Sequence, residues 1–372
     1  MKKKILIVAD TYAPRVDGIM RFLHEVLPRI ADDFAITLLV PDYGVSWTFN
    51  ERKVKLSRIV RLAGYQSLQL SLRNLRTIRD AVKEADTVFI QGPALISVLA
   101  LHYARNYHKT ALWYIHLILW ELYEKNLPRL LRRPAIPLFK RLVLSWYNTC
   151  DALIVPYKSL VRELTQLGIT TKKDVARLGV DSELLRPPED KAAAKQALGI
   201  PPNRIVVGYV GRISREKNVE VLVEAVQRLQ QDYPITLLAV GSGTEHMMKL
   251  FENTKNTVLP GFVRDVERYY QAMDIFVMPS LTETTSLATL EAMACGVPVV
   301  TTKVGFLKEY VIKNHNGLLF PRGNVYTLVL QLHKLIRRKR LRRYMGVNAR
   351  QTALQFSWDK TAARIKGILE RY

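Results

Sequence analysis

The sequence predicts an α/β protein built of two doubly wound parallel-sheet domains, and three observations support this expectation. The chain of 372 residues is longer than one hydrophobic core of ordinary size accommodates. Short apolar runs typical of buried strands alternate with segments of helical periodicity, which is the pattern of βαβ units. The alternation is interrupted once, where two pairs of prolines bracket a short charged segment, 189–200. We therefore expect a first domain over 1–180, a linker over 181–203 and a second domain over 204–357.

The first domain begins with an apolar strand and then alternates strands with helices. Its expected strands are Lys4–Ala9, Ala35–Val40, Arg58–Leu62, Thr87–Gln91, Ala111–His116, Asp151–Pro156 and Asp174–Leu178. Its clearest helical patterns are Gly18–Ile30, Leu72–Glu84, Leu95–Tyr107, Pro137–Asn148 and Lys158–Leu167. Strands connected in this way form a parallel sheet with helices on both faces, and functional residues gather at the carboxyl ends of the strands.

A second alternating set follows the linker. Its expected strands are Ile205–Val210, Ile235–Val240, Thr257–Pro260, Asp274–Met278 and Val297–Thr301. Its expected helices are Glu220–Gln230, Glu245–Phe251, Asp265–Met273 and Leu287–Ala294. The last of these is closed by Gly296 and followed by Pro298, which is a common way for a helix to end. Beyond Val325 the pattern is helical to the end of the chain.

Two strand ends of the first domain carry candidate functional residues. Gly18 opens a helix after the first strand, at a place where a backbone closely approaches a ligand. A plain turn with Asp17 as the helix cap explains this segment equally well. His116 brings an imidazole to the end of the fifth strand, although a lone histidine at a strand end is more often a packed or hydrogen-bonded residue than a catalyst.

The turn between the strand that ends at Met278 and the following helix is unusually polar. Residues 282–286 contain one carboxylate, Glu283, and four hydroxyls at a helix N-terminus, which is a favourable position for phosphate. Glu291 converges on Glu283 only if Glu283 lies in the turn and Glu291 in the helix, because eight residues on one helix place them about 80° apart. In the alternative interpretation, Glu283 and Ser286 cap the helix and Glu291 is solvated.

Two cations follow the first strand of the second domain. Arg212 and Lys217 are five residues apart in a turn that opens a helix, so both side chains are able to face one anion. In so basic a chain they are also compatible with ordinary surface charges. Gly241-Ser-Gly243, after the next strand, lacks the third glycine of a dinucleotide-binding fingerprint, which argues against NAD.

The net charge of +23, from 56 basic and 33 acidic residues, is abnormal. The excess is clustered in Arg52–Arg79, Lys125–Arg141 and Lys334–Arg343, none of which contains an acidic residue. Such clusters predict an anionic partner, either nucleic acid or membrane headgroups, unless they form only a soluble surface. No helix-turn-helix, zinc or single-strand-binding motif accompanies them, so nucleic acid is the least favoured partner.

Further features bear on the compartment. The longest apolar stretches, such as Ala111–Trp120, are far shorter than the ~20 residues that span a bilayer. The N-terminus, Met1-Lys-Lys-Lys, leads directly into a strand and does not resemble a signal peptide. Cys150 and Cys295 are isolated and lack metal-ligand spacing, which fits a reducing cytoplasm.

The combined motifs resemble the retaining nucleotide-sugar glycosyltransferases of family four. The motifs in the second half are Gly211-Arg-x4-Lys217, Val240-Gly-Ser-Gly243, Leu259-Pro-Gly-Phe-Val263 and Pro279-Ser-x2-Glu283-x7-Glu291. Those in the first half are Thr11-Tyr-x-Pro-x3-Gly18, the His116 strand end, Val155-Pro156 and Gly179-Val-Asp181. The resemblance covers essentially the whole chain. It implies the B-type glycosyltransferase fold, with two facing Rossmann-like domains and a C-terminal helix, 358–372, that returns to the first domain.

The resemblance also implies a role for each matching residue. Arg212 and Lys217 would neutralise the donor diphosphate as the leaving group departs. Glu291 would bind ribose hydroxyls. The transferred sugar and the phosphates would be held by Glu283 and by the backbone of Thr284, Thr285, Ser286 and Leu287. Val263 would contact the base, Gly18 would close on the phosphates, and His116 would line the reaction centre. Neither a cofactor nor a metal is implied, because cations and helix termini supply the electrostatic stabilisation.

One departure from the family pattern concerns the acceptor. Thr284-Thr285-Ser286 stands where many members have Gly-Phe-Gly, and Thr282-Glu-Thr284 resembles the branch that glycosylates membrane lipids, such as diacylglycerol glucosyltransferases. We therefore expect transfer of a hexose from a UDP-linked donor to a lipid. The basic clusters of the first domain would dock an anionic membrane, with Arg129, Arg132 and Arg133 as the test residues. The protein would then be cytoplasmic and peripheral to the inner face of the cell membrane. A soluble sugar or glycan acceptor and a hydrolysing nucleotide-sugar epimerase remain as alternatives.

Overall fold

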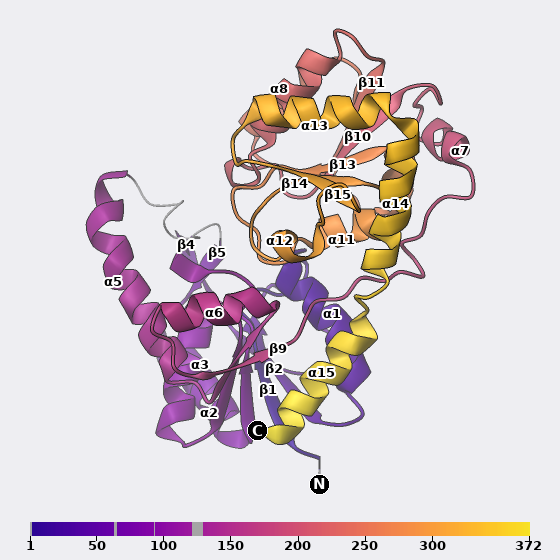
Figure 1. Ribbon diagram of the computed structural model, residues 1–372. Coiled ribbons are helices and arrows are strands. Elements are labelled where there is room, and N and C mark those ends of the chain that lie inside the picture. The colour runs from indigo at the N-terminus through magenta and orange to yellow at the C-terminus, as the bar shows by residue number, and fades with distance from the viewer. Residues whose placement is uncertain (1, 63–64, 93, 121–128) are drawn as a thin grey trace. The chain divides into compact units, whose positions relative to one another are not determined.

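A computed structural model describes residues 2–62, 65–92, 94–120 and 129–372, without the side chains of 58–62, 65 and 129–134. The chain forms two compact units (Figure 1). The first comprises Met1–Leu178 together with Trp358–Tyr372, and the second comprises Gly179–Ser357. Each unit contains its own parallel sheet, as the alternation of strands and helices predicts.

The first unit is organised around a seven-stranded sheet of order β3-β2-β1-β6-β7-β8-β9, in which all neighbouring strands are parallel. The strands are β1 (Lys4–Val8), β2 (Ala35–Pro41), β3 (Asn50–Val54), β6 (Thr87–Ile90), β7 (Thr110–Tyr114), β8 (Ala152–Val155) and β9 (Lys172–Val175). The strand order reverses between β1 and β6. The carboxyl ends of these two strands therefore flank the position where doubly wound sheets bind ligands.

The edge strand β3 was not expected from the sequence, because its residues, Asn-Glu-Arg-Lys-Val, are mostly polar. The expected strand Arg58–Leu62 does form, as β4 (Leu56–Leu62), but it lies outside the main sheet and pairs antiparallel with β5 (Tyr65–Leu68). Only two residues connect β4 to β5, and so short a connection allows an antiparallel hairpin but no parallel crossover. Its assignment to the alternating parallel set was therefore wrong.

The helices of the first unit begin close to where the sequence places them, except α5, which begins at Arg129 and not at the predicted Pro137. They are α1 (Gly18–Ile30), α2 (Leu72–Glu84), α3 (Leu95–Asn106), α5 (Arg129–Asn148), α6 (Lys158–Gln166) and α15 (Trp358–Arg371). Asp17 caps α1, because its Oδ1 accepts from the main-chain N–H groups of Ile19 and Met20. For α3 the equivalent acceptor comes from another element: buried Asp10 accepts from the N–H groups of Ala94 and Ile96.

The last helix, α15, belongs to the first unit and packs against α1 (Figure 1). Trp358, Ile365 and Leu369 are buried along it. Thr361 donates a hydrogen bond of 2.8 Å to the carbonyl of Arg177, and Arg364 forms an ion pair of 3.1 Å with Asp174. The chain therefore begins and ends in the same unit.

The second unit contains a six-stranded sheet of order β12-β11-β10-β13-β14-β15, again parallel throughout. The strands are β10 (Ile205–Val210), β11 (Ile235–Val240), β12 (Thr257–Gly261), β13 (Ile275–Met278), β14 (Val299–Thr302) and β15 (Gly317–Phe320). The strand order reverses between β10 and β13. The segment with Arg212 and Lys217 follows β10, and the polar turn 282–286 follows β13, so both lie at this switch point.

The helices of the second unit are α7 (Lys191–Gln196), the 3-10 turn η1 (Arg215–Lys217), α8 (Val219–Leu229), α9 (Glu245–Glu252), α10 (Glu267–Ala272), α11 (Leu287–Ala294), α12 (Leu307–Tyr310), α13 (Val325–Arg337) and α14 (Lys339–Ala353). Residues 181–203, expected as a linker, are part of this unit and not a separate connection. The physical reason is that α7 packs on α10, and buried Lys195 forms an ion pair of 2.6 Å with Asp274.

Candidate functional site

The two segments at the switch point of the second unit are joined by hydrogen bonds. The N–H of Leu281 donates to the carbonyl of Glu216 at 3.0 Å, and the side-chain amide of Asn218 donates to the carbonyl of Pro279 at 3.3 Å. The residues after β10 and those after β13 therefore form one surface. This convergence follows from the topology, since neighbouring parallel strands end at the same edge of the sheet.

Lys217 and Glu283 form the ion pair at the centre of this surface. Lys217 Nζ lies 2.6 Å from Glu283 Oε1, and the two side chains are only 18% and 8% exposed. The hydroxyl of Ser280 donates to the same carboxylate oxygen at 2.8 Å. The carboxylate is thus held in one orientation by two donors, and the ammonium is held beside the polar turn.

Arg212 has different surroundings. Its side chain is exposed and makes no ion pair with any residue that the structure describes. Its main chain is fixed, because Tyr209 OH donates to its carbonyl at 2.7 Å. The structure therefore gives one enclosed cation, Lys217, and one that extends into solvent from the same segment.

Glycines allow two main-chain segments to touch behind these cations. A Cβ on Gly241 would lie 1.9 Å from the carbonyl oxygen of Gly211, and one on Gly243 would lie 2.0 Å from that of Ile213. Both Gly211 and Gly241 also have positive φ angles, +146° and +144°, which other residues rarely adopt. The pair Gly241 and Gly243 therefore serves close packing on the 211–213 segment, and this explains it without a dinucleotide fingerprint.

The polar turn has a conformation that the sequence did not predict. Ser286, before α11, is left-handed with φ +60° and gives the helix no side-chain cap; its hydroxyl instead bonds that of Thr289 at 2.8 Å. Since Glu283 is bound by Lys217 and Ser280, neither residue caps the helix, and the capping interpretation is wrong. The N–H of Thr289 already donates to the carbonyl of Ser286 at 3.1 Å, so within the described chain the N–H groups of Leu287 and Ala288 are those left for another acceptor.

A second segment supports the turn from behind. Tyr310 OH donates to the carbonyl of Thr285 at 2.9 Å, and the N–H of Phe306 donates to that of Thr284 at 2.8 Å. Gly305 lies so close that a Cβ there would be 1.8 Å from the carbonyl oxygen of Glu283. The hydroxyl of Thr285 is buried and has no partner among the described atoms. The turn is thus rigidly held and retains unused hydrogen-bonding capacity.

Glu291 lies half-buried on α11, as expected, and accepts a hydrogen bond of 2.8 Å from Tyr270 OH. Burial, followed by the charge of Glu291, raises the pKa of Tyr270, so that this hydroxyl remains a donor at neutral pH. Val263 lies half-buried beyond the end of β12, two strands away from β10. Glu291 therefore lies beside the turn, whereas Val263 lies farther along the same edge.

In the first unit, Gly18 begins α1 as expected. A Cβ at this position would meet no atom within 4 Å, so packing within the chain does not require glycine here. Asp17 caps the helix and also accepts a hydrogen bond of 2.7 Å from Thr11. Asp17 therefore caps this helix, as the alternative interpretation has it. The cap leaves open space next to Gly18.

His116 is a packed histidine in this structure. Its ring stacks on Tyr114 at 4.3 Å between centroids and meets the edge of Phe22 at 5.1 Å, and its Nε2 lies 2.8 Å from Gln91 Oε1. Burial lowers the pKa of His116 to about 3, so its imidazole is neutral at physiological pH. It is therefore suited to hydrogen bonding and not to carrying a positive charge.

Three contributors to these sites were not predicted as functional residues. Ser280 orients Glu283, Tyr270 binds Glu291, and Gln91 holds His116. Ser280 lies two residues past the end of β13, and Gln91 lies one residue past the end of β6. Their position after a strand was the signal in the sequence that could have identified them. Tyr270 gave no such signal, because it comes from a helix, α10.

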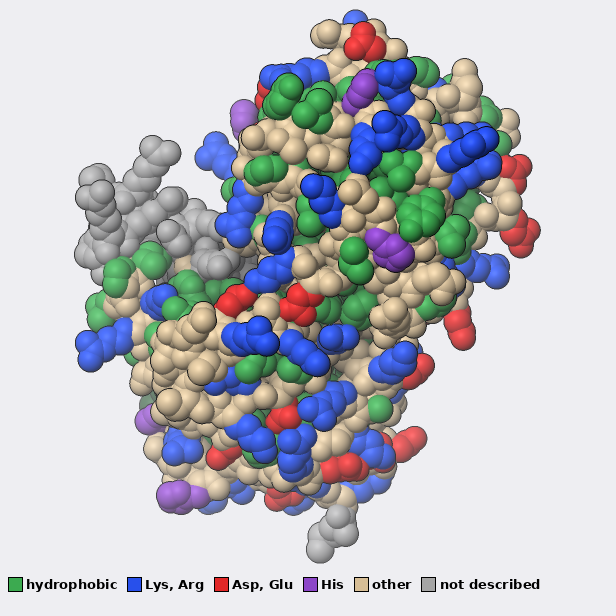
Figure 2. Space-filling view, in the orientation of Figure 1, with side chains coloured by type: hydrophobic (Ala, Val, Ile, Leu, Met, Phe, Trp, Pro, Cys, Tyr) green, Lys and Arg blue, Asp and Glu red, His purple; other side chains and the backbone are tan. Residues whose placement is uncertain are grey.

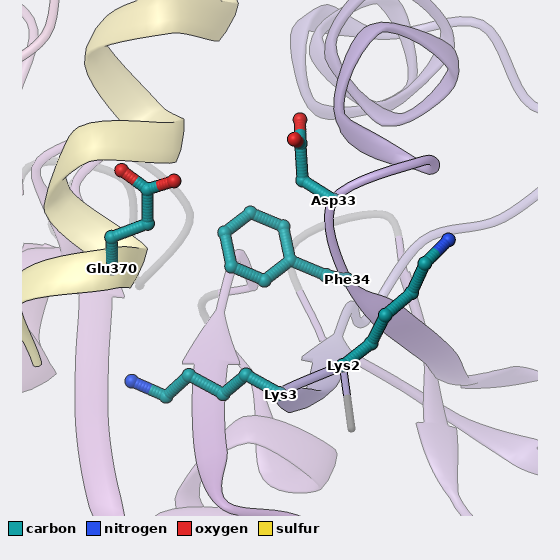
Figure 3. A pocket seen from close by; sticks show the side chains of 5 residues that line it. All are labelled: Lys2, Lys3, Asp33, Phe34 and Glu370. Atoms are coloured by element: carbon teal, nitrogen blue, oxygen red, sulfur yellow. The ribbon is translucent and has the colours of Figure 1, made fainter.

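The charged depression drawn in Figure 3 lies elsewhere in the first unit, near the amino-terminal end of β1. It has a volume of about 700 Å³ and is lined by Lys2, Lys3, Asp33, Phe34 and Glu370. The ring of Phe34 lies at its centre, with the carboxylates of Asp33 and Glu370 on one side (Figure 3). Asp33 also pairs with Lys366 of α15, so these charges serve the attachment of that helix.

The predicted membrane-docking residues are only partly described. Arg129, Arg132 and Arg133 lie in α5, but their side chains are outside the described residues. Farther along α5, Leu138 and Leu142 are 72% and 46% exposed, with exposed Arg141 between them.

The other basic cluster is mixed in character. Leu70 and Leu72 are 70% and 73% exposed, whereas Leu68 is buried. None of the helices, as far as they are described, is long and apolar enough to cross a membrane. The described residues also include no group of three or more His, Cys, Asp or Glu side chains arranged to hold a metal ion.

Two parallel-sheet units, each with its polar residues at a switch point, define a two-domain protein of the B-type glycosyltransferase fold. Comparison with known families agrees. Residues 16–184 match "Glycosyltransferase Family 4", and residues 190–352 match "Glycosyl transferases group 1". The chain therefore belongs to glycosyltransferase family four, with one of the two matches in each half.

Among curated proteins, the chain is similar to D-inositol 3-phosphate glycosyltransferase of Streptomyces bingchenggensis, with 32% identity over 51% of this chain and 45% of the relative. The relative of the same name from Corynebacterium urealyticum is 32% identical over 60% of this chain and 57% of its own length. The chain thus spans about half the length of these relatives. Sulfoquinovosyl transferase SQD2 of Arabidopsis thaliana is 25% identical over 95% of this chain and 69% of its own.

Solved structures show the same fold at low identity. Sucrose-phosphate synthase from Thermosynechococcus elongatus superposes with a TM-score of 0.81 at 18% identity, covering 100% of this chain and 99% of that one. Anabaena HepE in complex with UDP and glucose has a TM-score of 0.80 at 18% identity, with both chains covered completely. These likenesses establish the architecture.

Proposed function

We propose that this protein is a retaining glycosyltransferase that moves a hexose from a UDP-linked donor to a lipid acceptor at an anionic membrane surface. The observation that carries the proposal is the arrangement at the β10–β13 switch point. Lys217 is held against Glu283, Arg212 extends from the same segment, and the uncapped N-terminus of α11 lies beside them. Two cations and free N–H groups suit a diphosphate, whereas the carboxylates suit sugar hydroxyls.

The proposed chemistry assigns each group a share of the leaving diphosphate's charge. Arg212 binds it from the solvent side and Lys217 from within, and the dipole of α11 adds partial positive charge. In this scheme the cations take the part that a divalent metal plays elsewhere, so no metal is required. Glu291 and Glu283 accept hydrogen bonds from the donor's ribose and transferred sugar, and the unpartnered hydroxyl of Thr285 supplies a further bond.

In the first unit, the proposal gives Gly18 and His116 supporting roles. The open space at Gly18 admits a phosphate close to the start of α1. The neutral imidazole of His116 binds a sugar hydroxyl at the reaction centre. Neither role involves proton transfer.

Three features support a lipid acceptor. The Thr282-Glu-Thr284 pattern resembles the lipid-glycosylating branch, and a relative that matches along 95% of this chain is named a sulfoquinovosyl transferase. The described part of α5 exposes Leu138 and Leu142 beside Arg141, and cations next to apolar residues suit an anionic bilayer. On this proposal the protein works at the cytoplasmic face of the cell membrane.

The direct test is to incubate the protein with a panel of nucleotide sugars, with and without a lipid extract, and to follow released nucleotide. We expect UDP release that depends on lipid, and a glycolipid product that keeps the donor's anomeric configuration. Glu283→Gln, which keeps the shape of the side chain, is the inactive control. Release without any acceptor would identify an epimerase or hydrolase and overturn the proposal.

Membrane docking by the first unit has its own test. We expect Arg129→Glu/Arg132→Glu/Arg133→Glu to weaken sedimentation with anionic liposomes, because each cation contributes roughly 1 kcal/mol near such a surface. A matched control reverses three exposed cations outside the clusters, Lys83, Arg105 and Lys158. Equal binding of the native chain to neutral and anionic liposomes would contradict docking, as would equal losses in the two variants.

A soluble acceptor is the second candidate, because relatives about 32% identical are named D-inositol 3-phosphate glycosyltransferases. On this alternative the acceptor is a sugar phosphate, and the same nucleotide-release assay would respond to inositol phosphate without lipid. A response to lipid alone excludes it.

A further inference from the structure

A long part of the second unit contains no acidic residue. Residues 311–357 include ten Lys or Arg and neither Asp nor Glu. This stretch forms α13 and α14, together with β15 and the loop 312–316 before it. None of its residues belongs to the donor site proposed above. The charge therefore needs a separate explanation.

The helix α14 presents one continuous face to solvent. Its exposed residues recur at spacings of three, four and seven, which on a helix places them within about 100° of arc. They are Arg340, Arg343, Tyr344, Val347 and Gln351, with Leu354 directly after the helix; Lys339, in the first turn, is also exposed but lies outside this arc. Tyr344 is 53% exposed and Val347 62%, so cations alternate with large apolar side chains on this face.

The neighbouring helix and loop extend the same surface. On α13, Tyr326 and Leu330 lie one turn apart and are 67% and 46% exposed. Lys334 Nζ donates to Asn314 Oδ1 at 2.9 Å, and Tyr344 OH bonds His315 Nδ1 at 3.4 Å, so the loop 312–316 connects the two helices. We call the exposed side chains of Ile312–Leu354 the α13–α14 face. Figure 2 shows basic and apolar side chains interspersed over this part of the second unit.

The exposed cations of the α13–α14 face are not used within the protein. The run Arg337–Arg340 and Arg343 are exposed and form no ion pair within the described part of the chain. Arg342 and Arg350 differ, because they are less exposed and donate to main-chain carbonyls such as those of Leu335 and Leu185. Five neighbouring cations without counter-charges repel one another, and an external anion relieves this repulsion.

We propose that the α13–α14 face docks the second unit on a lipid bilayer with anionic headgroups. Unpaired cations supply attraction to the headgroups. Tyr326 and Tyr344 suit the interface between headgroups and acyl chains, and Leu330, Val347 and Leu354 provide apolar surface to bury there. A nucleic acid would match the charge but would leave these aliphatic side chains without a partner. This docking surface is independent of the one in the first unit and of any transfer activity.

A probe on the face itself tests the proposal in the full chain. An environment-sensitive fluorophore is attached at Val347→Cys, since both native cysteines are buried. Vesicles of phosphatidylcholine, with and without phosphatidylglycerol, are then added. We expect a blue shift only with phosphatidylglycerol, and no shift when the same label is at Lys255→Cys. This readout reports the second unit alone, and it requires no nucleotide sugar, so failure of the proposed enzymatic function would not affect it.

Two variants identify the interaction. Arg338→Glu/Arg340→Glu/Arg343→Glu should lower the vesicle partition coefficient of the second unit, read from the Val347 label, by about a hundredfold or more. Tyr344→Ser/Val347→Ser should weaken sedimentation of the unlabelled chain with retained salt dependence. The matched control, Arg228→Glu/Lys249→Glu/Lys255→Glu, makes the same charge change elsewhere on this unit and should leave the label's response unchanged.

Several results would overturn the proposal. One is an unshifted label at position 347 with anionic vesicles; another is an equal effect of the control triple change. A label that responds to duplex DNA but not to vesicles would assign the face to nucleic acid. An oligomer that dissociates in Tyr344→Ser/Val347→Ser, without a change in vesicle binding, would assign it to a second copy of this chain.

Discussion

Replacing Lys217 with Ala removes the cation at the centre of the second unit's site. Its Nζ lies 2.6 Å from Glu283 Oε1, and the carboxylate, 8% exposed, would keep Ser280 as a donor. Breaking a fully buried pair costs about 3–5 kcal/mol; the 18% exposure of Lys217 and the remaining Ser280 bond bring the expected cost nearer about 2 kcal/mol. For a domain of this size, that lowers Tm by about 4–8 °C.

The effect on transfer should be larger than the effect on stability. Loss of one charged donor from a transition-state site costs about 10²–10³-fold in kcat, which corresponds to about 2.7–4 kcal/mol. UDP release is therefore measured well below Tm, where the variant is fully folded, so that the stability loss does not enter the rate. Lys217→Arg keeps the charge and should retain more activity than Lys217→Ala.

A second substitution isolates the effect on stability. In Lys217→Ala/Glu283→Gln the neutral amide at position 283 needs no counter-charge, so Tm should recover toward the native value. The rate should remain low, because Glu283→Gln is itself expected to be inactive. Near-native activity of Lys217→Ala alone would refute the assignment of Lys217 to the donor diphosphate.

The remaining predictions concern other parts of the molecule. Arg212→Ala should lower kcat about 10²-fold. Its Tm should stay unchanged, because the exposed side chain of Arg212 has no ion pair within the described chain. An equal loss of kcat in the control Lys255→Ala would count against a role of Arg212 in transfer. Deletion after Ser357 removes buried Trp358, Ile365 and Leu369 and should expose the first unit to proteolysis; unchanged protection would mean that α15 is dispensable. Because the pKa of His116 is lowered to about 3 in the folded protein, its contribution to stability is present above pH ~6.5 and is lost as the pH falls, by at most about 1.4 kcal/mol per unit. The free energy of unfolding, measured in urea, should therefore fall less between pH 7.5 and 5.5 in His116→Gln than in the native protein. An identical fall in both would contradict this. Activity should survive excess chelator, and complete loss that added metal restores would refute metal independence.

Elements defined by local signals were predicted well. The strands Ile205–Val210 and Ile235–Val240 have the predicted bounds because both are mostly apolar runs. The helix α1 begins at the predicted residue because Asp17 is a strong cap. In these elements the residues that decide the structure are neighbours in the sequence.

Elements defined by distant partners were missed. β3 is a polar edge strand that pairs with β2, so its formation depends on the sheet and not on its own residues. The prolines around 189–200 predicted a linker, but the ion pair of Lys195 with Asp274, 79 positions away, ties this segment to the second unit. No local pattern contains that information.

The candidate site also has features that the sequence predicts and features that it does not. The sheet topology predicts that residues following β10 and β13 meet, and Lys217 and Glu283 do meet. The left-handed Ser286 was not predictable, because serine before a helix ordinarily caps it. Here Thr289 takes its hydroxyl, and Tyr310 holds the adjoining carbonyls from a distant segment.

The central claim is that the turn after β10 and the N-terminus of α11 bind a nucleoside diphosphate. Calorimetric titration of UDP, UMP and uridine into the native chain and into Arg212→Ala and Lys217→Ala measures this most directly. The account predicts that UDP binds more tightly than UMP and uridine in the native chain, and that each substitution removes most of this advantage while leaving uridine binding unchanged. Equal affinity for UDP and uridine in the native chain, or an advantage of UDP that persists in both variants, would contradict it.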